Sequence, residues 1–217
     1  MRRRECLARI GPMIDDQLIP SRVGPGGLDW GPKALHEGIL YGTGLGLTTA
    51  LGLGLAVSLP HRKILVLDSD GGILMGVGVF ATIANVNPPN LIVVIFDNGA
   101  YGSTGGQPTA TAGGSDLAEI GRGAGIHNVR EARTVDEFEA AFHSAEGAGG
   151  STLIVAKVDV ETKETESSGK ILGDGRENMY RFVRYLEKTE GKRVLRMAKP
   201  GRFDAELVET LSYGGKS

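Results

Sequence analysis

The sequence predicts an α/β fold: a parallel sheet with helices on both faces. Two short apolar runs, 63–68 and 91–97, are branched and uncharged inside, as expected for strands that are covered on both faces. The segment 72–86 between them has the length and apolar density of a buried crossover helix. Since such crossovers are right-handed in nearly all proteins, both strands are expected to end at the same edge of a parallel sheet.

Further elements are expected on both sides of this unit. Before it, the pattern predicts an amphipathic helix over 1–18, a Gly/Pro-rich connector over 20–32 and a glycine-rich helix from Gly42. After it, helices and strands are predicted to alternate at 116–125, 126–129, 134–147 and 152–158. Beyond a polar, linker-like stretch, apolar side chains recur with the spacing of one helical face at Met179, Phe182, Val183 and Leu186.

Length and composition indicate one compact domain with a tail. The expected parts of the 217 residues are an N-terminal helix and connector (1–34), a central domain (35–160) and a polar linker with a helical tail (161–217). The net charge of −2 gives no general attraction to nucleic acid or to an anionic membrane. Cys6 is the only cysteine, which excludes a disulfide framework or a zinc cluster within this sequence and favours a reducing, cytoplasmic setting.

One stretch invites a different interpretation. Residues 38–59 contain no charged side chain, and 22 residues are enough to span a bilayer. However, the stretch holds six glycines and four Ser or Thr residues, and it leads directly into a predicted strand of the sheet. The basic residues near the N-terminus are followed by Glu5 and not by an apolar segment, so no signal peptide is expected. We therefore interpret 38–59 as part of the soluble fold.

Polar residues follow both central strands of the predicted sheet. Asp70 comes after the first and Asn98 after the second, at the edge where open α/β sheets bind ligands. A carboxylate oxygen and an amide oxygen suit Mg²⁺ that is shared with ligand phosphates. Gly71 and Gly72 then open a helix, where free N–H groups and the absence of Cβ atoms allow a phosphate to approach. The pattern therefore predicts a magnesium diphosphate site, although a strand-end Asp and Asn can also simply cap turns.

These residues resemble the signature of thiamine diphosphate enzymes. Ser69-Asp70-Gly71-Gly72 is followed, 28 residues after Asp70, by Asn98 in Asp97-Asn98-Gly99-Ala100. The family's usual form is Gly-Asp-Gly-Ser and then Asn-Asn, so Ser69 and Gly72 depart from it. The resemblance covers roughly residues 35–160. It implies that Asp70, Asn98 and the backbone carbonyl of Ala100 hold Mg²⁺, and that Gly71, Gly72, Tyr101 and Gly102 also contact the cofactor.

A second match lies upstream, at Thr43-Gly44-Leu45-Gly46. In the family this segment grips the aminopyrimidine ring. The resemblance implies that Gly44 belongs to the grip, that Leu45 wedges the cofactor into a bent shape, and that the Thr43 carbonyl accepts a hydrogen bond from the 4′-amino group. His36, just before this segment, is a candidate proton relay, although a lone histidine near a helix start is more often structural.

The tract 97–109 is most similar to the β subunits of sulfopyruvate decarboxylase and to the matching domain of phosphonopyruvate decarboxylase. The implied reaction converts a small anionic 2-oxo acid to an aldehyde and CO₂. In this family the cofactor is activated by a glutamate from a pyrimidine-binding domain, for which the sequence offers no candidate. The resemblance thus implies a two-chain enzyme with a pyrimidine-binding α-type partner and active sites at the interface.

Three alternatives remain at this point. A 2-oxoacid oxidoreductase β subunit carries a similar loop, but it usually brings cysteine ligands for an iron–sulfur cluster, which Cys6 alone cannot provide. An acetolactate synthase-like carboligase would share the cofactor and differ in its product. A non-catalytic scaffold would retain only the fold. The second Gly-Asp-Gly, at 173–175, follows a polar stretch and not a strand, so we interpret it as a turn.

Overall fold

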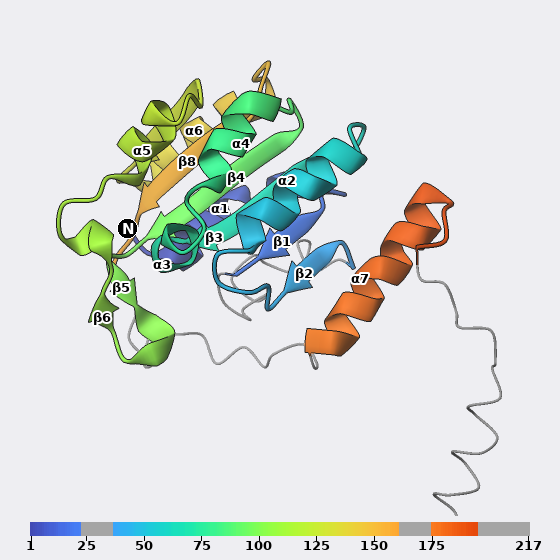
Figure 1. The fold of residues 1–217 in the computed structure, drawn as a ribbon, viewed down its shortest axis with the longest axis horizontal. Coiled ribbons are helices and arrows are strands. Elements are labelled where there is room, and N and C mark those ends of the chain that lie inside the picture. The colour runs from blue at the N-terminus through green and yellow to red at the C-terminus, as the bar shows by residue number, and fades with distance from the viewer. Residues whose placement is uncertain (23–36, 161–174, 195–217) are drawn as a thin grey trace, which may run out of the picture. The chain divides into compact units, whose positions relative to one another are not determined.

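The computed structural model describes residues 1–22, 37–160 and 175–194. Within these ranges the chain forms a six-stranded sheet in the order β2-β1-β3-β4-β8-β7, and every neighbouring pair is parallel (Figure 1). The strands are β1 (Ile19–Ser21), β2 (Ile39–Tyr41), β3 (Ile64–Ser69), β4 (Leu91–Asp97), β7 (Asn128–Ala132) and β8 (Thr152–Lys157). The predicted parallel sheet is therefore confirmed.

Helices cover both faces of this sheet. The described α-helices are α1 (Arg3–Ile10), α2 (Thr48–Ser58), α3 (Asp70–Leu74), α4 (Val79–Val86), α5 (Leu117–Gly123), α6 (Val135–Glu146) and α7 (Gly175–Glu190). A short antiparallel hairpin of β5 (Ala100–Tyr101) and β6 (Gln107–Pro108) follows β4. In Figure 1, α2 and α4 lie in front of the sheet, and α1 and α6 lie behind it. The prediction of helices on both faces is confirmed as well.

Alternation along the strands assigns side chains to the two faces. Leu67, Phe96 and Ala156 belong to one core cluster, together with buried residues of α1 and α6. The rings of Phe96 and Phe138 contribute to this cluster with centroids 5.9 Å apart. A sheet buried on this scale explains why the β3 and β4 sequences are almost continuously apolar.

Helices α2 and α5 pack against the opposite face of the sheet at glycine positions. A Cβ atom on Gly52 would lie 2.0 Å from Cγ2 of Val66, and one on Gly121 would lie 2.5 Å from Cδ2 of Leu153. Val66 and Leu153 both align with Val93 of β4, so they share one face of the sheet. The helix backbones thus lie directly on the strands, which small residues alone permit.

The predicted single helix over 72–86 is wrong. The structure divides this region into α3, ending at Leu74, and α4, beginning at Val79. The break follows from a close backbone approach, because a Cβ on Gly76 would lie 2.3 Å from the carbonyl oxygen of Gly46. The helix expected from Gly42 begins only at Thr48, because Gly42 and Gly46 have positive φ values (71° and 78°) that a right-handed helix does not contain, and the loop meets the end of α3 at Gly46.

The N-terminal prediction also needs correction. The helix expected over 1–18 ends at Ile10 and is followed by a single 3-10 turn, Gly11–Met13. Strands β1 and β2 were not predicted, and Pro20, expected in a connector, lies inside β1. Proline in a strand normally argues against that assignment, because it cannot donate to the ladder. The strand predicted at 126–129 lies instead at Asn128–Ala132. The expected segments at 23–32 and 161–174 lie outside the described residues.

The chain groups into two compact units, Met1–Phe182 and Val183–Ser217. In the first unit, the Asn178 side chain completes the outer edge of β2: its amide group donates to the Ile39 carbonyl (3.1 Å), and its Oδ1 accepts from the Tyr41 N–H (2.7 Å). None of the described helices is long and apolar enough to cross a membrane. The expected division of the chain at residues 34 and 160 stays a prediction.

The glycine contacts on α2 lead to a testable prediction about stability. We expect Gly52→Ala to destabilise the chain by about 1–3 kcal/mol, the usual cost of forcing extra volume into a packed core, because the new methyl group collides with Val66. Gly54→Ala is the matched control, since its Cβ meets nothing within 4 Å and alanine favours a helix by about 0.5–1 kcal/mol. Urea unfolding of both variants measures the difference. Equal stabilities would contradict the close packing of α2 on β3.

Candidate functional site

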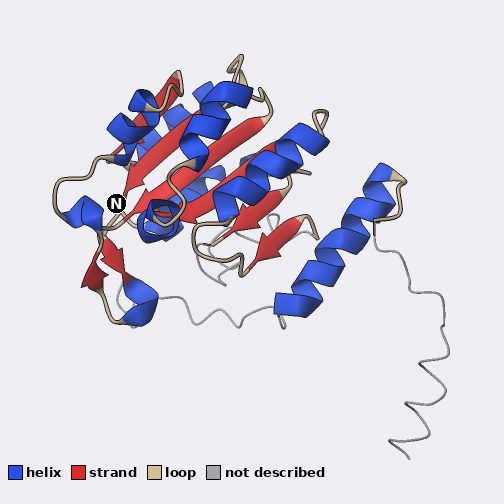
Figure 2. Ribbon diagram, viewed as in Figure 1, coloured by secondary structure: helices blue, strands red, loops and turns tan. Residues whose placement is uncertain are grey.

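The parallel sheet brings the two predicted ligand residues to one edge. Ser69 and Phe96 are register partners at the ends of β3 and β4, so Asp70 and Asn98 follow neighbouring strands at the same level to within a residue. Figure 2 shows the strand arrows pointing toward the edge where α3 and the β5–β6 hairpin lie. This is the carboxyl edge, where parallel α/β sheets bind ligands.

Asp70 is fully buried at the start of α3, and its two carboxylate oxygens differ. Oδ2 accepts a hydrogen bond from the hydroxyl of Thr109 (2.6 Å), and the hydroxyl of Thr111 lies 3.1 Å from the same oxygen. Oδ1 is buried without a hydrogen-bond partner among the described residues. Burial raises the pKa of the Asp70 carboxyl; the Thr109 hydroxyl and the backbone N–H of Gly71 oppose this rise, and the charge of Asp97 adds to it. A buried oxygen without a donor is rare in folded proteins and requires an explanation.

Asp97 extends this cluster toward β8. Its Oδ1 accepts from the Thr111 hydroxyl (2.7 Å), and its Oδ2 pairs with Nζ of Lys157 (2.6 Å). Asp97 and Lys157 are register partners on adjacent strands, so the sheet itself sets this ion pair. Sequence reasoning missed Thr111 and Lys157, because their contacts depend on a loop path and on the pairing of β4 with β8.

Asn98 forms a tight turn after β4. Its Oδ1 accepts the Ala100 N–H (3.0 Å), and the carbonyl of Gly99 in this turn accepts the N–H of Thr109 (2.9 Å). The alternative that Asn98 caps a turn is thus realised. The hydrogen bond uses one lone pair of the amide oxygen, and the second lone pair is available to another partner. For Asp70 the same alternative does not explain the unpartnered Oδ1.

Gly71 and Gly72 are required by the packing of the chain itself. A Cβ on Gly71 would lie 2.3 Å from the Tyr101 ring, and one on Gly72 would lie 2.4 Å from Oδ1 of Asp68. The Gly72 N–H donates to the hydroxyl of Ser69 (3.1 Å). Contrary to the expectation of free N–H groups at this helix start, the Gly72 N–H is therefore occupied, and the cause is the side chain of Ser69.

The upstream segment 43–46 contacts the same end of α3. Gly46 has a φ of +78°, and a Cβ there would lie 3.2 Å from the backbone of Met75. The Thr43 hydroxyl lies 2.6 Å from that of Thr48 and donates to the carbonyl of Ser21 (3.2 Å), which fixes the loop against β1. Leu45 is 37% exposed. Gly46 thus contacts the end of α3 and Thr43 is fixed to β1, while the roles of Thr43, Gly44 and Leu45 toward a cofactor stay predictions.

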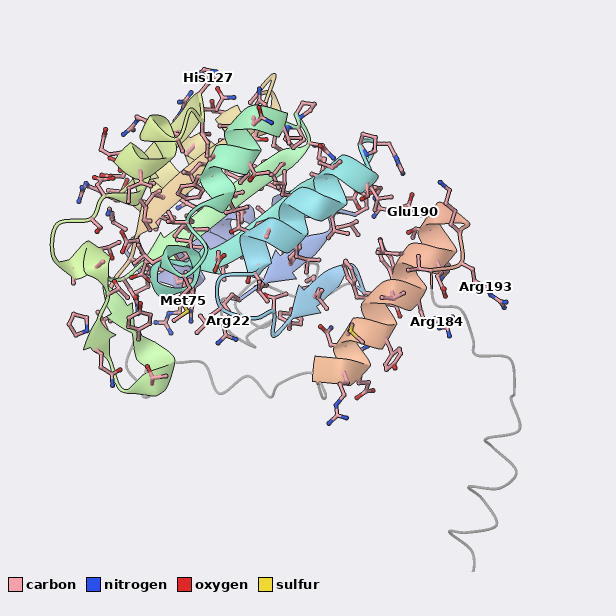
Figure 3. The ribbon with its side chains drawn as sticks, in the orientation of Figure 1. Arg22, Met75, His127, Arg184, Glu190 and Arg193 are labelled. Carbon is pink, nitrogen blue, oxygen red and sulfur yellow. The ribbon has the colours of Figure 1, made fainter. Side chains whose placement is uncertain are left out.

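Asp68, two residues before Asp70, is also fully buried and was missed by sequence reasoning. Its Oδ1 accepts the Ser69 N–H (2.9 Å), and its Oδ2 accepts the Thr49 hydroxyl (2.8 Å). Burial raises the pKa of the Asp68 carboxyl, which the Thr49 hydrogen bond and the charge of Arg22 oppose. Arg22 follows β1 at the carboxyl edge, where Figure 3 labels it below α3. Both oxygens of Asp68 are satisfied, unlike those of Asp70.

The remaining predicted residues are placed as follows. Tyr101 ends β5 and covers Gly71, and Gly102 begins the 3-10 turn Gly102–Thr104. His36 lies outside the described residues, so its role as a proton relay stays a prediction. No cluster of three or more His, Cys, Asp or Glu side chains suited to a metal occurs within the described ranges. Any metal at Asp70 would therefore depend on amide, carbonyl and ligand oxygens.

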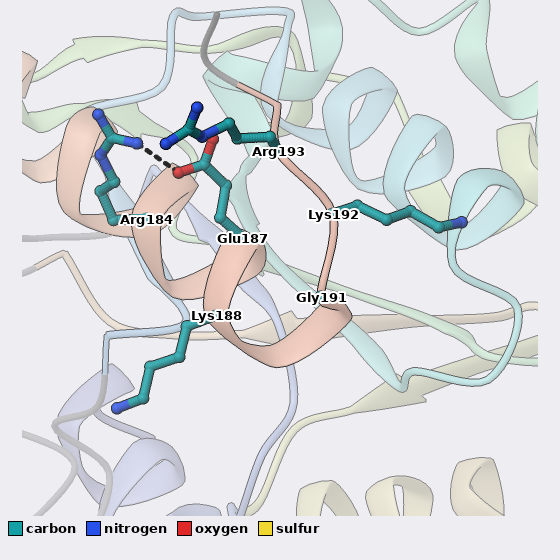
Figure 4. Close-up of a pocket in the computed structure, with 6 residues that line it drawn as sticks. All are labelled: Arg184, Glu187, Lys188, Gly191, Lys192 and Arg193. Atoms are coloured by element: carbon teal, nitrogen blue, oxygen red, sulfur yellow. Dashed lines mark hydrogen bonds and ion pairs between the residues drawn. The ribbon is translucent and has the colours of Figure 1, made fainter. Parts of the chain in front are cut away.

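A pocket at the C-terminal end of α7 is lined mainly by charged side chains (Figure 4). An ion pair joins Arg184 to Glu187, and the Val194 N–H donates to Glu187 (2.8 Å). The lining residues are Arg184, Glu187, Lys188, Gly191, Lys192 and Arg193. None of these belongs to the predicted site, and mixed charge on a surface helix is typical of a solvated face.

Comparison with known proteins identifies a family. Residues 29–156 match the model for the thiamine pyrophosphate enzymes, specifically their C-terminal TPP binding domain. The chain is 42% identical over 113 residues to the sulfopyruvate decarboxylase subunit beta of Methanocaldococcus jannaschii, which covers 52% of this chain and 59% of that protein. It is 37% identical over 110 residues to the phosphonopyruvate decarboxylase of Streptomyces hygroscopicus, which covers 51% of this chain and 27% of that protein.

Solved structures agree on the fold. The thiamine diphosphate-dependent 4-hydroxybenzoylformate decarboxylase of Rhodococcus jostii superposes with a TM-score of 0.60 at 23% identity, over 74% of this chain and 33% of that one. The benzoylformate decarboxylase of Polynucleobacter necessarius also gives a TM-score of 0.60, at 21% identity, over 75% of this chain and 34% of that one. The chain spans about three fifths of the length of the first two subunits beta that it matches.

The contrast between the two buried aspartates gives a prediction for the ligand-free chain. Because burial raises the pKa of Asp70, its ionised form costs stability above that pKa, and the cost disappears as the pH falls toward the ordinary value of 3.8. We therefore expect Asp70→Asn to keep or raise the free energy of unfolding at neutral pH. Asp68→Asn should lower the free energy of unfolding by about 1–3 kcal/mol. Both oxygens of Asp68 accept hydrogen bonds, so the NH₂ group of asparagine would face either the Thr49 hydroxyl or the Ser69 N–H, which are donors.

Urea unfolding at pH 7, with a chelator present, measures both variants. A loss of stability in Asp70→Asn equal to that in Asp68→Asn would show that Asp70 is a satisfied structural group.

Proposed function

Because the chain belongs to the thiamine pyrophosphate enzymes through their C-terminal TPP binding domain, we propose that it is the diphosphate-binding subunit of a two-chain, Mg²⁺-dependent decarboxylase. Its substrate is a small anionic 2-oxo acid similar to sulfopyruvate or phosphonopyruvate, and its products are an aldehyde and CO₂. The names of the relatives support this assignment. The working compartment is the cytoplasm, in line with the use of a single, buried cysteine.

The observation that carries the proposal is the unpartnered Oδ1 of Asp70. Mg²⁺ is commonly held by one or two carboxylates together with substrate phosphates. In our proposal Asp70 supplies the carboxylate, Asn98 its amide oxygen and Ala100 its backbone carbonyl. The diphosphate completes the shell near the start of α3, at Gly71 and Gly72. This donor set is all oxygen, as a hard cation requires.

The other cofactor contacts follow from the same alignment. In our proposal Thr43 and Gly44 meet the aminopyrimidine, Leu45 braces the bent cofactor, and Tyr101 and Gly102 border the diphosphate. The exposed side chain of Leu45, and the contact of the next residue, Gly46, with Met75 at the end of α3, support this arrangement. When bound, the cofactor supplies the electron sink for decarboxylation, and this chain anchors and orients it.

A pyrimidine-binding α-type partner completes the proposed enzyme and supplies the activating glutamate. Support comes from the name of the relatives, which are called beta subunits. The chain also presents apolar side chains along α2, where Leu47 (63% exposed), Leu51 and Val57 face away from the core. Exposed apolar surface of this kind commonly marks a protein interface.

For the second acidic group of the substrate we propose Arg22. This residue follows β1, and its N–H donates to the Leu67 carbonyl (2.8 Å), which places its backbone beside the end of β3. Lys157 ends β8 at the same edge, but it is already paired with Asp97. A guanidinium group suits the planar or tetrahedral oxygens of carboxylate, sulfonate and phosphonate.

The first test is made with the pure chain. We expect it to bind Mg²⁺ and thiamine diphosphate in calorimetry, and we expect Asp70→Ala to abolish this binding with little loss of folding. It should release no CO₂ from sulfopyruvate, phosphonopyruvate or pyruvate until the chain that co-purifies with it is added. Lack of cofactor binding by the wild-type chain would refute the proposal. Steady turnover by the chain alone would refute its two-chain form.

The second test concerns Arg22 in the two-chain enzyme. Losing one charge-assisted hydrogen bond, worth about 1.5–3 kcal/mol, should raise the KM of Arg22→Met for sulfopyruvate or phosphonopyruvate by about tenfold or more. The KM for pyruvate, which lacks the second acidic group, should change little. Arg133→Met is the control, because Arg133 also follows a strand at this edge but pairs with Glu131 (2.6 Å). The same rise in KM for all substrates would remove Arg22 from substrate recognition.

A further inference from the structure

The two threonine hydroxyls near Asp70 lie against the same carboxylate oxygen. The hydroxyls of Thr109 and Thr111 both lie within hydrogen-bond distance of Oδ2, while Oδ1 remains buried and unpartnered among the described residues. Two hydroxyl groups against the same oxygen limit the rotation of the carboxylate about its Cβ–Cγ bond. Oδ1, which receives no hydrogen bond from the described residues, is therefore held in one direction.

Thr109 joins the two halves of the proposed cation site. Its hydroxyl contacts Asp70 at 2.6 Å, and its own N–H donates to the carbonyl of Gly99, between Asn98 and Ala100. Its methyl group packs above α3, because Cγ2 would lie 3.3 Å from a Cβ on Gly71. Thr109 is almost completely buried. Thr109 thus connects Asp70, after β3, with the turn after β4 that contains Asn98 and Ala100.

Thr111 connects this arrangement to the neighbouring strand. Its hydroxyl lies 2.7 Å from Asp97, 2.8 Å from Thr109 and 3.1 Å from Asp70. A hydroxyl group carries one proton, so the shortest contacts assign the Thr111 proton to Asp97 and the Thr109 proton to Asp70. Each carboxylate then receives one hydroxyl proton, and Lys157 compensates the charge of Asp97.

We propose that Thr109 and Thr111 are positioning residues, which hold Oδ2 of Asp70 so that Oδ1 faces a bound divalent cation. Asp97 and Lys157 brace the pair from β4 and β8. This inference rests on the proposed function and adds residues to it that do not touch the cation. Groups that orient a metal ligand in this way commonly change metal affinity by about 10- to 100-fold when they are removed.

Asp68 provides an internal comparison. Thr49 donates to Asp68 over 2.8 Å in an equally buried setting, so Thr49→Val removes the same kind of hydrogen bond. Both oxygens of Asp68 accept hydrogen bonds, so neither oxygen is left for a ligand. The loss of Thr49 therefore lowers stability without changing the orientation of a cation ligand.

The test uses the full chain with thiamine diphosphate and follows the electron paramagnetic resonance signal of free Mn²⁺, a substitute for Mg²⁺. We expect Thr109→Val to weaken Mn²⁺ binding by about 10- to 100-fold, and Thr111→Val to weaken it less, since its proton serves Asp97. Thr109→Ser keeps the hydroxyl and should recover most of the affinity. Thr49→Val should bind Mn²⁺ as the wild-type chain does, despite a lower unfolding temperature.

The outcomes separate this inference from the proposed function. Equal Mn²⁺ affinity in the wild-type chain, Thr109→Val and Thr111→Val would overturn the positioning role alone. A loss of affinity in Thr49→Val as large as in Thr109→Val would also overturn it, because general destabilisation would then explain both. Absence of Mn²⁺ binding in the wild-type chain would overturn the proposed function and this inference together.

Discussion

The candidate site depends on the parallel pairing of β3 with β4. This register places Ser69 beside Phe96, and with it Asp70 and the Asn98 turn at one edge. The next pair, β4 with β8, sets Lys157 beside Asp97 by the same rule. Because strand pairing fixes the backbone over several residues, the site gains rigidity from the most buried part of the molecule. A shift of one residue between β4 and β8 would place the side chains of Asp97 and Lys157 on opposite faces of the sheet.

Close backbone approaches at glycines complete the geometry. Gly46 meets Gly76 and Met75, which connects the loop before α2 to the end of α3. Gly71 and Gly72 leave space for the Tyr101 ring and the Asp68 carboxylate. A glycine-rich sequence near a phosphate site is usually explained by access for the ligand. Here the protein's own side chains occupy much of that space, so the glycines serve the assembly of the site before they serve any ligand.

The sequence was most informative where periodicity and length agree. It predicted the parallel sheet, β4 at Leu91–Asp97 and the edge that joins Asp70 with Asn98. It did not predict β1 and β2, because each strand has only three residues and β1 contains Pro20. The break between α3 and α4 depends on a contact with Gly46, and the Thr109 and Thr111 hydrogen bonds depend on a returning loop. Such contacts are set by tertiary structure, which local patterns do not contain.

Asp68 and Asp70 differ in a way that distinguishes a satisfied structural carboxylate from a candidate cation ligand, without reference to any family. Both are fully buried, and burial raises the pKa of each. Asp68 is the last but one residue of β3, where it accepts the Ser69 N–H and the Thr49 hydroxyl, so folding already replaces the water that it loses. Asp70 receives donors on one oxygen only. The folded chain therefore leaves one carboxylate oxygen undersolvated, and a cation at that oxygen would restore what burial removed.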